Sequence, residues 1–242
     1  MGSAYMTDPR PAFYAIPGSR SGDLVTLLHL PYLMWHLSYV AIGAAMAPQI
    51  DAPRLAGSLL AFAFGVGIGA HALDELHDRP LATGLSSGTL RVLGWGGLAA
   101  GATLAVAAAV VISPVALAWG AVGVLLAAAY ALEWSLWIHS TVGFGLAWGA
   151  FPVLVGYWAQ TESISMAVVV VAVAATFFSM AQRTLSTPAR HVRRAVANAT
   201  AEIGDASWSR STLLATWERP LRLLAIAHVL LAIGLLLSHL PT

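Results

Sequence analysis

The chain has 242 residues, of which 58% are hydrophobic and only 10% are charged, and its mean hydropathy is +0.76. The net charge of +1 excludes a broad nucleic-acid-binding face, and the lack of cysteine excludes disulfides, zinc–thiolate sites and thiol nucleophiles. Several stretches run for about 20 residues without a charge, which is the length needed to cross a hydrocarbon core of about 30 Å.

The order of polar and apolar stretches along the chain predicts one membrane domain preceded by a short polar segment. Residues 1–23 contain proline and glycine but no apolar core, so we expect a cytoplasmic segment and not a cleaved signal peptide. Residues 24–242 form the membrane domain, with cytoplasmic loops at 74–88 and 186–219. About seven spans are predicted in it, at residues 24–47, 55–73, 89–112, 114–134, 141–159, 164–185 and 221–240. The fold class is therefore an all-α, polytopic membrane helical bundle.

The arginines predict the orientation of this bundle. The chain contains no lysine, and seven spans place eleven of the twelve arginines on one side, with only Arg54 opposite. Because basic residues concentrate in cytoplasmic loops, the N-terminus is expected in the cytoplasm and the C-terminus outside. A lysine-free, alanine- and arginine-rich composition is typical of a GC-rich bacterial genome, so the predicted location is a bacterial inner membrane.

Glycines recur in the second and third predicted spans. Small residues let helix backbones approach closely in a membrane, so we expect tight packing between these two spans. The glycines concerned are Gly65, Gly67, Gly69, Gly94, Gly96, Gly97 and Gly101.

An acidic cluster ends the second predicted span. On a helix, His71, Asp74, Glu75 and Asp78 lie on one face, because they are spaced by three, four and seven residues. Three carboxylates this close repel one another unless a cation neutralises them, and hard oxygen ligands suit Mg²⁺. The simpler alternative is a solvated helix end paired with nearby arginines.

A second kind of metal site is also compatible with these residues. His71 and His77, with His139 from the start of the fifth span, could join the carboxylates to bind a transition metal such as Zn, Fe or Mn. Glu133 lies beside two tryptophans and is predicted to be an interfacial anchor.

The acidic cluster resembles a motif of the UbiA superfamily of intramembrane prenyltransferases. That family carries N-D-x-x-D-x-x-x-D at the end of its second membrane helix, followed by a cytoplasmic R-P-L-P-S-G loop. Here the stretch from Ala70 to Asp78 keeps the spacing of the motif, with Ala70 and His71 at its first two positions. The following residues, Arg79-Pro-Leu-Ala-Thr-Gly84, are similar to the loop.

The resemblance implies a UbiA-like enzyme, either a prenyltransferase-like transferase or a terpene cyclase. Its partners would be an isoprenoid diphosphate or another lipid as substrate, together with membrane lipids, and its cofactor would be Mg²⁺. Asp74 and Asp78 would be the catalytic metal ligands, Glu75 would assist them, and Arg79 would contact the diphosphate.

The chain departs from the family in two places. Family members have a second D-x-x-x-D motif near the end of the sixth helix and usually nine spans, whereas this region is basic and the chain has about seven. Arg183, Arg190 and Arg194 could bind a diphosphate directly, because guanidinium groups match phosphate oxygens, or could anchor the loop to anionic headgroups. A non-catalytic protein that binds a lipid or a partner membrane protein is therefore the remaining alternative.

Overall fold

The structure is a computed structural model that describes residues 10–16, 18–195, 200–203 and 206–240. The elements are α1 (Arg20–Leu27), α2 (Leu30–Ala45), α3 (Ala52–Phe62), α4 (His71–Asp78), α5 (Ser87–Val111), α6 (Ala116–Ala131), α7 (Thr141–Gly145), α8 (Phe151–Thr161), α9 (Met166–Ala195), β1 (Thr200–Ile203), β2 (Ala206–Ser209) and α10 (Arg210–Leu237). The predicted N-terminal segment falls partly outside the described residues.

The helices confirm the prediction of a multi-pass membrane protein. In the part of the chain that the structure describes, six helical stretches are long and apolar enough to cross a bilayer: Arg20–Ala45, Ala52–Asp78, Ser87–Val111, Thr141–Thr161, Met166–Arg194 and Arg210–Leu237. α6 takes the place of the predicted fourth span, but it is apolar over only 16 residues.

Two of the long stretches contain π-helical segments. Ala63–Ala70 joins α3 to α4, and Leu146–Ala150 joins α7 to α8. Such segments widen a helix locally and occur often near functional sites. The first of them leads directly into the acidic cluster, which lies wholly on α4.

The first long stretch is broken between α1 and α2. His29 has a φ of 50°, in the left-handed region, and Pro31 follows in the first turn of α2. Proline has no backbone N–H to donate to the preceding turn, and it disfavours a helical conformation in the residue before it. Pro31 therefore favours a new helix start here over the continuation of α1. α2 then continues as the central helix of the bundle.

Glycine contacts join several helices closely, as predicted for the second and third spans. A Cβ atom on Gly97 would overlap the backbone of Gly69, and one on Gly94 would meet the side chain of Leu73. Gly65 lies beside Gly101, whose Cβ would be 3.4 Å from the Gly65 Cα atom, whereas Gly96 has nothing within 4 Å of such an atom and takes no part in this packing. The tightest approach is elsewhere, between α2 and α8, where Gly43 and Gly156 each face a carbonyl of the other helix: Gly43 that of Val153, and Gly156 that of Val40.

The stretch predicted as a loop over 186–219 is mostly helical. α9 continues through Pro188 to Ala195, and α10 begins at Arg210, where the side chain of Ser209 accepts a hydrogen bond from the Thr212 amide. Ala189 and Val192 are buried against Leu214, so the apolar spacing of a helix persists among the arginines. Among the residues described between the two helices, a short antiparallel ribbon is formed by β1 and β2.

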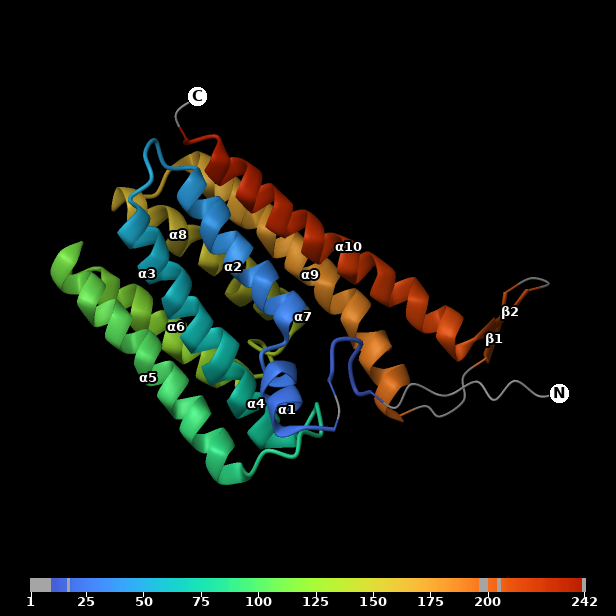
Figure 1. Cartoon of the computed structure of the whole chain (residues 1–242). Coiled ribbons are helices and arrows are strands. Elements are labelled where there is room, and N and C mark those ends of the chain that lie inside the picture. Colours follow the sequence, from blue (N-terminus) through green and yellow to red (C-terminus); the bar gives the residue numbers. More distant parts are fainter. Residues whose placement is uncertain (1–9, 17, 196–199, 204–205, 241–242) are drawn as a thin grey trace.

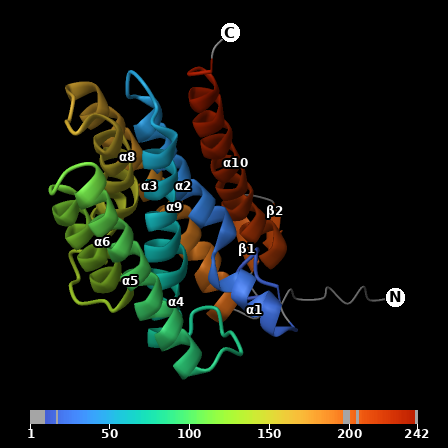
Figure 2. The same ribbon diagram turned by 60° about the vertical axis from the view of Figure 1, so that its left-hand side comes forward.

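The helices pack as one bundle with a lateral pair. α2 lies against α8 and α10, and α9 packs against α10 and the π-helical part of the fourth long stretch. α5 and α6 run antiparallel to each other on the side away from α10 (Figures 1 and 2). One of the two large buried clusters is centred on α2 and includes Trp35, Tyr39, Val153 and Val168.

Candidate functional site

The acidic cluster lies at the end of the bundle where α4 ends and where the C-terminal part of α9 is found (Figure 1). We call this end, which carries Arg79, Arg183, Arg190 and Arg194, the arginine-rich end. The opposite end carries Arg54 and the C-terminal end of α10, and we call it the Arg54 end.

Asp74 on α4 faces two arginines of α9. The charges of Arg190 and Arg194 both act on the half-buried Asp74 carboxyl group, and the Asp74 charge acts in turn on Arg194. Arg183, Arg190 and Arg194 are spaced by seven and four residues, so they follow one face of α9. The structure therefore brings together an acidic motif and a basic helix that are far apart in the sequence.

Arg190 and Arg194 have hydrogen-bonding capacity to spare. Within the described residues, neither forms a salt bridge, and the hydrogen bond that Arg190 donates goes to the Thr187 hydroxyl, at 3.4 Å. Each guanidinium has five N–H donors in a planar fork, which fits the oxygens of a phosphate group. These two arginines can therefore bind an anion without breaking a strong internal contact.

Glu75 is turned away from Asp74, into the loop that follows α4. Its side chain is fully buried, and its two oxygens accept hydrogen bonds from the Leu81 amide (2.8 Å), the Thr83 amide (2.8 Å) and the Thr83 hydroxyl (2.9 Å). A carboxylate with three such donors is satisfied without a cation. Glu75 therefore stabilises the loop after α4. The sequence pattern alone did not indicate this role.

Asp78 meets a different set of groups, on the exposed side of α4. Ligand atoms of His77, Asp78 and Glu133 all lie within 4.8 Å of one another, close enough to share one cation. Glu133 also lies 3.4 Å from the ring Nε2 of His139 and acts electrostatically on Asp74. The predicted single face of four ligands is therefore divided, with Asp78 beside Glu133 and Asp74 beside the arginines.

His71 is occupied by backbone and ring contacts. Its Nδ1 lies 3.2 Å from the Gly67 carbonyl oxygen, its ring also contacts the Leu28 carbonyl, and it stacks on His29 with centroids 4.1 Å apart. Leu28 and His29 form the break between α1 and α2, so His71 supplies a hydrogen-bonding partner to backbone that the break exposes. His71 and His77 are not brought together, because one ring faces the bundle and the other faces outward.

Tyr14 and Tyr32 lie against each other near Arg190 and Arg194. Tyr14 lies against Tyr32 (ring centroids 5.6 Å apart) and against His29 (5.4 Å). Burial, reinforced by Tyr32, raises the pKa of the Tyr14 phenol above its ordinary value, although Arg190 and Arg194 oppose the shift. Tyr14 therefore stays protonated and offers a neutral O–H donor beside the two arginines.

The other two arginines predicted to bind substrate hold the protein together. Arg79 donates to the Leu85 carbonyl at 2.7 Å and to the Ser87 hydroxyl at 3.0 Å, which closes the loop before α5. Arg183 donates to the Tyr130 hydroxyl and, at 2.6 Å, to the His139 carbonyl, so it ties α9 to the α6–α7 connection. Both guanidinium groups are engaged within the described structure.

No protein-family model, curated protein or solved structure matches this chain. The resemblance to the UbiA superfamily therefore rests on residues 70–84, and the relationship stays a prediction.

Glu133 and Tyr14 are the site residues that sequence reasoning missed. Glu133 was interpreted as an interfacial anchor, yet it meets Asp78 because the fourth predicted span ends beside the second. The signal was available, since an acidic residue ends that span on the side of the motif. Tyr14 lies outside the predicted spans, and nothing in the sequence pattern indicated that residues 10–16 fold back onto the bundle.

Proposed function

We propose that the protein is a UbiA-like membrane enzyme that acts on a prenyl diphosphate, by prenyl transfer or by cyclisation, with Mg²⁺ bound near the end of α4. The observation that supports this most is that Asp74 on α4 lies within electrostatic reach of Arg190 and Arg194 on α9. A carboxylate for the cation and two uncommitted guanidinium groups for the anion are the groups that a magnesium diphosphate needs.

The donor set suits a hard cation. Asp74, Asp78 and Glu133 offer carboxylate oxygens, and Mg²⁺ commonly uses one or two such groups together with waters and phosphate oxygens. When bound, Mg²⁺ would neutralise charge that builds up on the departing diphosphate. Glu133 would stand in for part of the second acidic motif that the sequence lacks.

The protein side chains would do the rest by binding and positioning. Arg190 and Arg194 would hold the diphosphate oxygens, and the Tyr14 hydroxyl would donate to one of them. Departure breaks the bond between the allylic carbon and the diphosphate oxygen, and the electron pair leaves with the oxygen. The resulting allylic cation then gains a nucleophile or loses a proton, and aromatic side chains at this end, including Tyr32 and His29, would border its chain.

The proposal is tested first by binding. Inorganic diphosphate with Mg²⁺ should bind the purified protein, and Arg190→Gln and Arg194→Gln should each weaken that binding by roughly 10- to 150-fold, since a hydrogen bond to a charged group contributes about 1.5–3 kcal/mol. Arg91→Gln is the matched control, because Arg91 is an exposed arginine at the same end and has no partner among the described residues. Equal binding by all the variants would contradict the proposal.

Turnover is the second test. A panel of prenyl diphosphates of different lengths should release diphosphate in the presence of Mg²⁺, and Asp74→Asn should abolish the release while the protein stays folded. Binding of diphosphate without turnover of any panel member would leave a lipid-diphosphate-binding protein and refute the enzymatic part.

One observation favours a second candidate, a transition-metal enzyme. His77, Asp78 and Glu133 form a mixed nitrogen and oxygen donor set, and His139 lies next to Glu133. Elemental analysis of the protein as purified decides between the two. A stoichiometric transition metal that His77→Ala removes would support this candidate, whereas a protein without one, active only with added Mg²⁺, would support the first.

A further inference from the structure

A cavity of about 550 Å³ lies toward the Arg54 end of the bundle. Its walls come from α3, α5, α6 and α8, so it opens between the lateral pair α5–α6 and the rest of the bundle (Figures 1 and 2). The volume is within the range of about 300–1,000 Å³ that is typical of small-molecule sites. This cavity shares no residue with the arginine-rich end.

The cavity is lined mainly by apolar groups. Part of its space exists because some of the lining residues are glycines, which have no side chain to fill it. Aromatic side chains form one wall of it, among them Phe62, Trp119 and Phe151, which lie against one another. Gly57 and Gly65 line it from α3 and the π-helical segment, and a Cβ atom on either would have nothing within 4 Å. The space in front of these glycines is therefore unfilled, unlike the space at the glycines that join α2 to α8.

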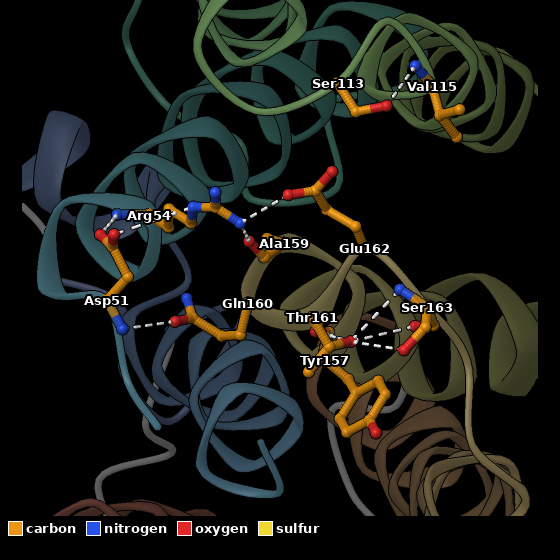
Figure 3. A network of polar contacts seen from close by, with 10 residues as sticks. All are labelled: Asp51, Arg54, Ser113, Val115, Tyr157, Ala159, Gln160, Thr161, Glu162 and Ser163. Atoms are coloured by element: carbon orange, nitrogen blue, oxygen red, sulfur yellow. Dashed lines mark hydrogen bonds and ion pairs between the residues drawn. The ribbon is translucent and has the colours of Figure 1, made fainter. Parts of the chain in front are cut away.

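A polar network borders one end of the cavity (Figure 3). Arg54 donates through Nη1 to Glu162 at 3.1 Å and to the Ala159 carbonyl at 3.3 Å, and its Nε lies 3.8 Å from Asp51. Its other terminal nitrogen, Nη2, has no hydrogen bond among the described residues.

The charges at this border decide which head group fits. Two carboxylates surround one guanidinium, so the border carries a net negative charge, which would repel phosphate or carboxylate groups. The donor left over, on Arg54, calls for an uncharged oxygen acceptor such as a carbonyl or hydroxyl. An apolar cavity with this border, between membrane helices, matches an uncharged lipid.

We propose that the cavity binds an uncharged membrane lipid, with a hydrocarbon chain along the aromatic wall and an acceptor oxygen on Arg54 Nη2. Acyl and isoprenoid lipids share this chemistry. The proposal does not rest on the diphosphate chemistry at the arginine-rich end, and either of the two can fail alone.

The test uses the full chain in phosphatidylcholine vesicles that contain a photoactivatable diacylglycerol with a diazirine on its acyl chain. Crosslinks should map to peptides of α3, α5, α6 and α8. Gly57→Leu/Gly65→Leu, which fills the space, should reduce this labelling at least tenfold. Gly96→Leu is the matched control, because Gly96 is an exposed helical glycine with equally free space that does not line the cavity. Since leucine favours a helix more than glycine does, both changes should leave the protein folded.

Competition identifies the head group. Unlabelled diacylglycerol or polyprenol should displace the probe, and the better competitor identifies the source of the chain, whereas phosphatidylglycerol should compete at least tenfold less well. Arg54→Gln should weaken labelling about threefold to tenfold. Three results would overturn the proposal: labelling that the glycine variants do not change, stronger competition by the anionic lipid, or a cavity closed by a second copy, seen as a dimer that Gly57→Leu/Gly65→Leu dissociates.

Discussion

Glu75→Gln separates a structural carboxylate from a metal ligand. The substitution keeps the shape of the side chain but removes its charge and replaces one acceptor oxygen by an NH₂ group. Both oxygens of Glu75 are in use, one for Leu81 and one for Thr83, so the amide group cannot satisfy both. We therefore expect the loop from Arg79 to Leu85 to open more often, while the metal-binding groups are unchanged.

The size of the effect follows from these three contacts. One buried N–H loses its acceptor, at a cost of about 1–3 kcal/mol, and the remaining bonds change from charged to neutral, which weakens them further. A total of about 2–4 kcal/mol corresponds to amide exchange that is roughly 30- to 700-fold faster, because each 1.4 kcal/mol is a factor of ten.

Hydrogen–deuterium exchange of the peptide that covers the loop measures this directly. Asp78→Asn is the control, because Asp78 lies on the same helix but is exposed and outside the hydrogen bonds of the loop. Binding of Mn²⁺, used as a spectroscopic probe for Mg²⁺, should change less than twofold in Glu75→Gln and at least tenfold in Asp74→Asn. Normal loop protection together with lost Mn²⁺ binding in Glu75→Gln would refute the reasoning and make Glu75 a ligand.

Three further predictions concern packing, charge and orientation. Gly43→Ala would overlap the Val153 carbonyl between α2 and α8, so the thermal unfolding temperature in detergent should fall by several degrees, as for an overpacked core at about 1–3 kcal/mol. Glu218→Gln removes the negative charge from a buried ion pair between α9 and α10, so we expect a loss of about 3–5 kcal/mol, visible as lower yield of folded protein. Because the chain has no cysteine, Ser87→Cys and Ser163→Cys report orientation in intact cells: an impermeant maleimide should label only the second, and the reverse pattern would invert the topology.

The membrane bundle could be predicted from the sequence because apolar length is a local property. Each predicted span overlaps a helix, and the helix ends follow local signals, such as the Asp51 cap of α3 and the Ser86 cap of α5. The region 186–219 was misjudged because charge was taken as a sign of a loop. Ala189 and Val192 keep the helical period there, and periodicity was the better guide.

The site could be predicted only as a set of residues. Helical spacing placed His71, Asp74, Glu75 and Asp78 on one face, but spacing does not indicate which neighbour each side chain meets. The loop after α4 folds back so that the Leu81 amide donates to Glu75, and the break between α1 and α2 places His29 against the His71 ring. Such contacts depend on how other segments of the chain pack against α4, and a short sequence motif carries no information about that packing.

The lengths of two helices have a consequence for the depth of the proposed site. α2 starts only at Leu30 and α6 ends at Ala131, and each has 16 residues, or about 24 Å, against about 37 Å for the 25 residues of α5. A hydrocarbon layer is about 30 Å thick, so the two short helices fall about 6 Å short of spanning it. Both meet the arginine-rich end beside Asp74 and Glu133, and the longer helices rise around them. The polar groups lie beside the ends of these two short helices, so a ligand with a charged head and an oily tail could keep its tail in the bilayer while its head reaches them.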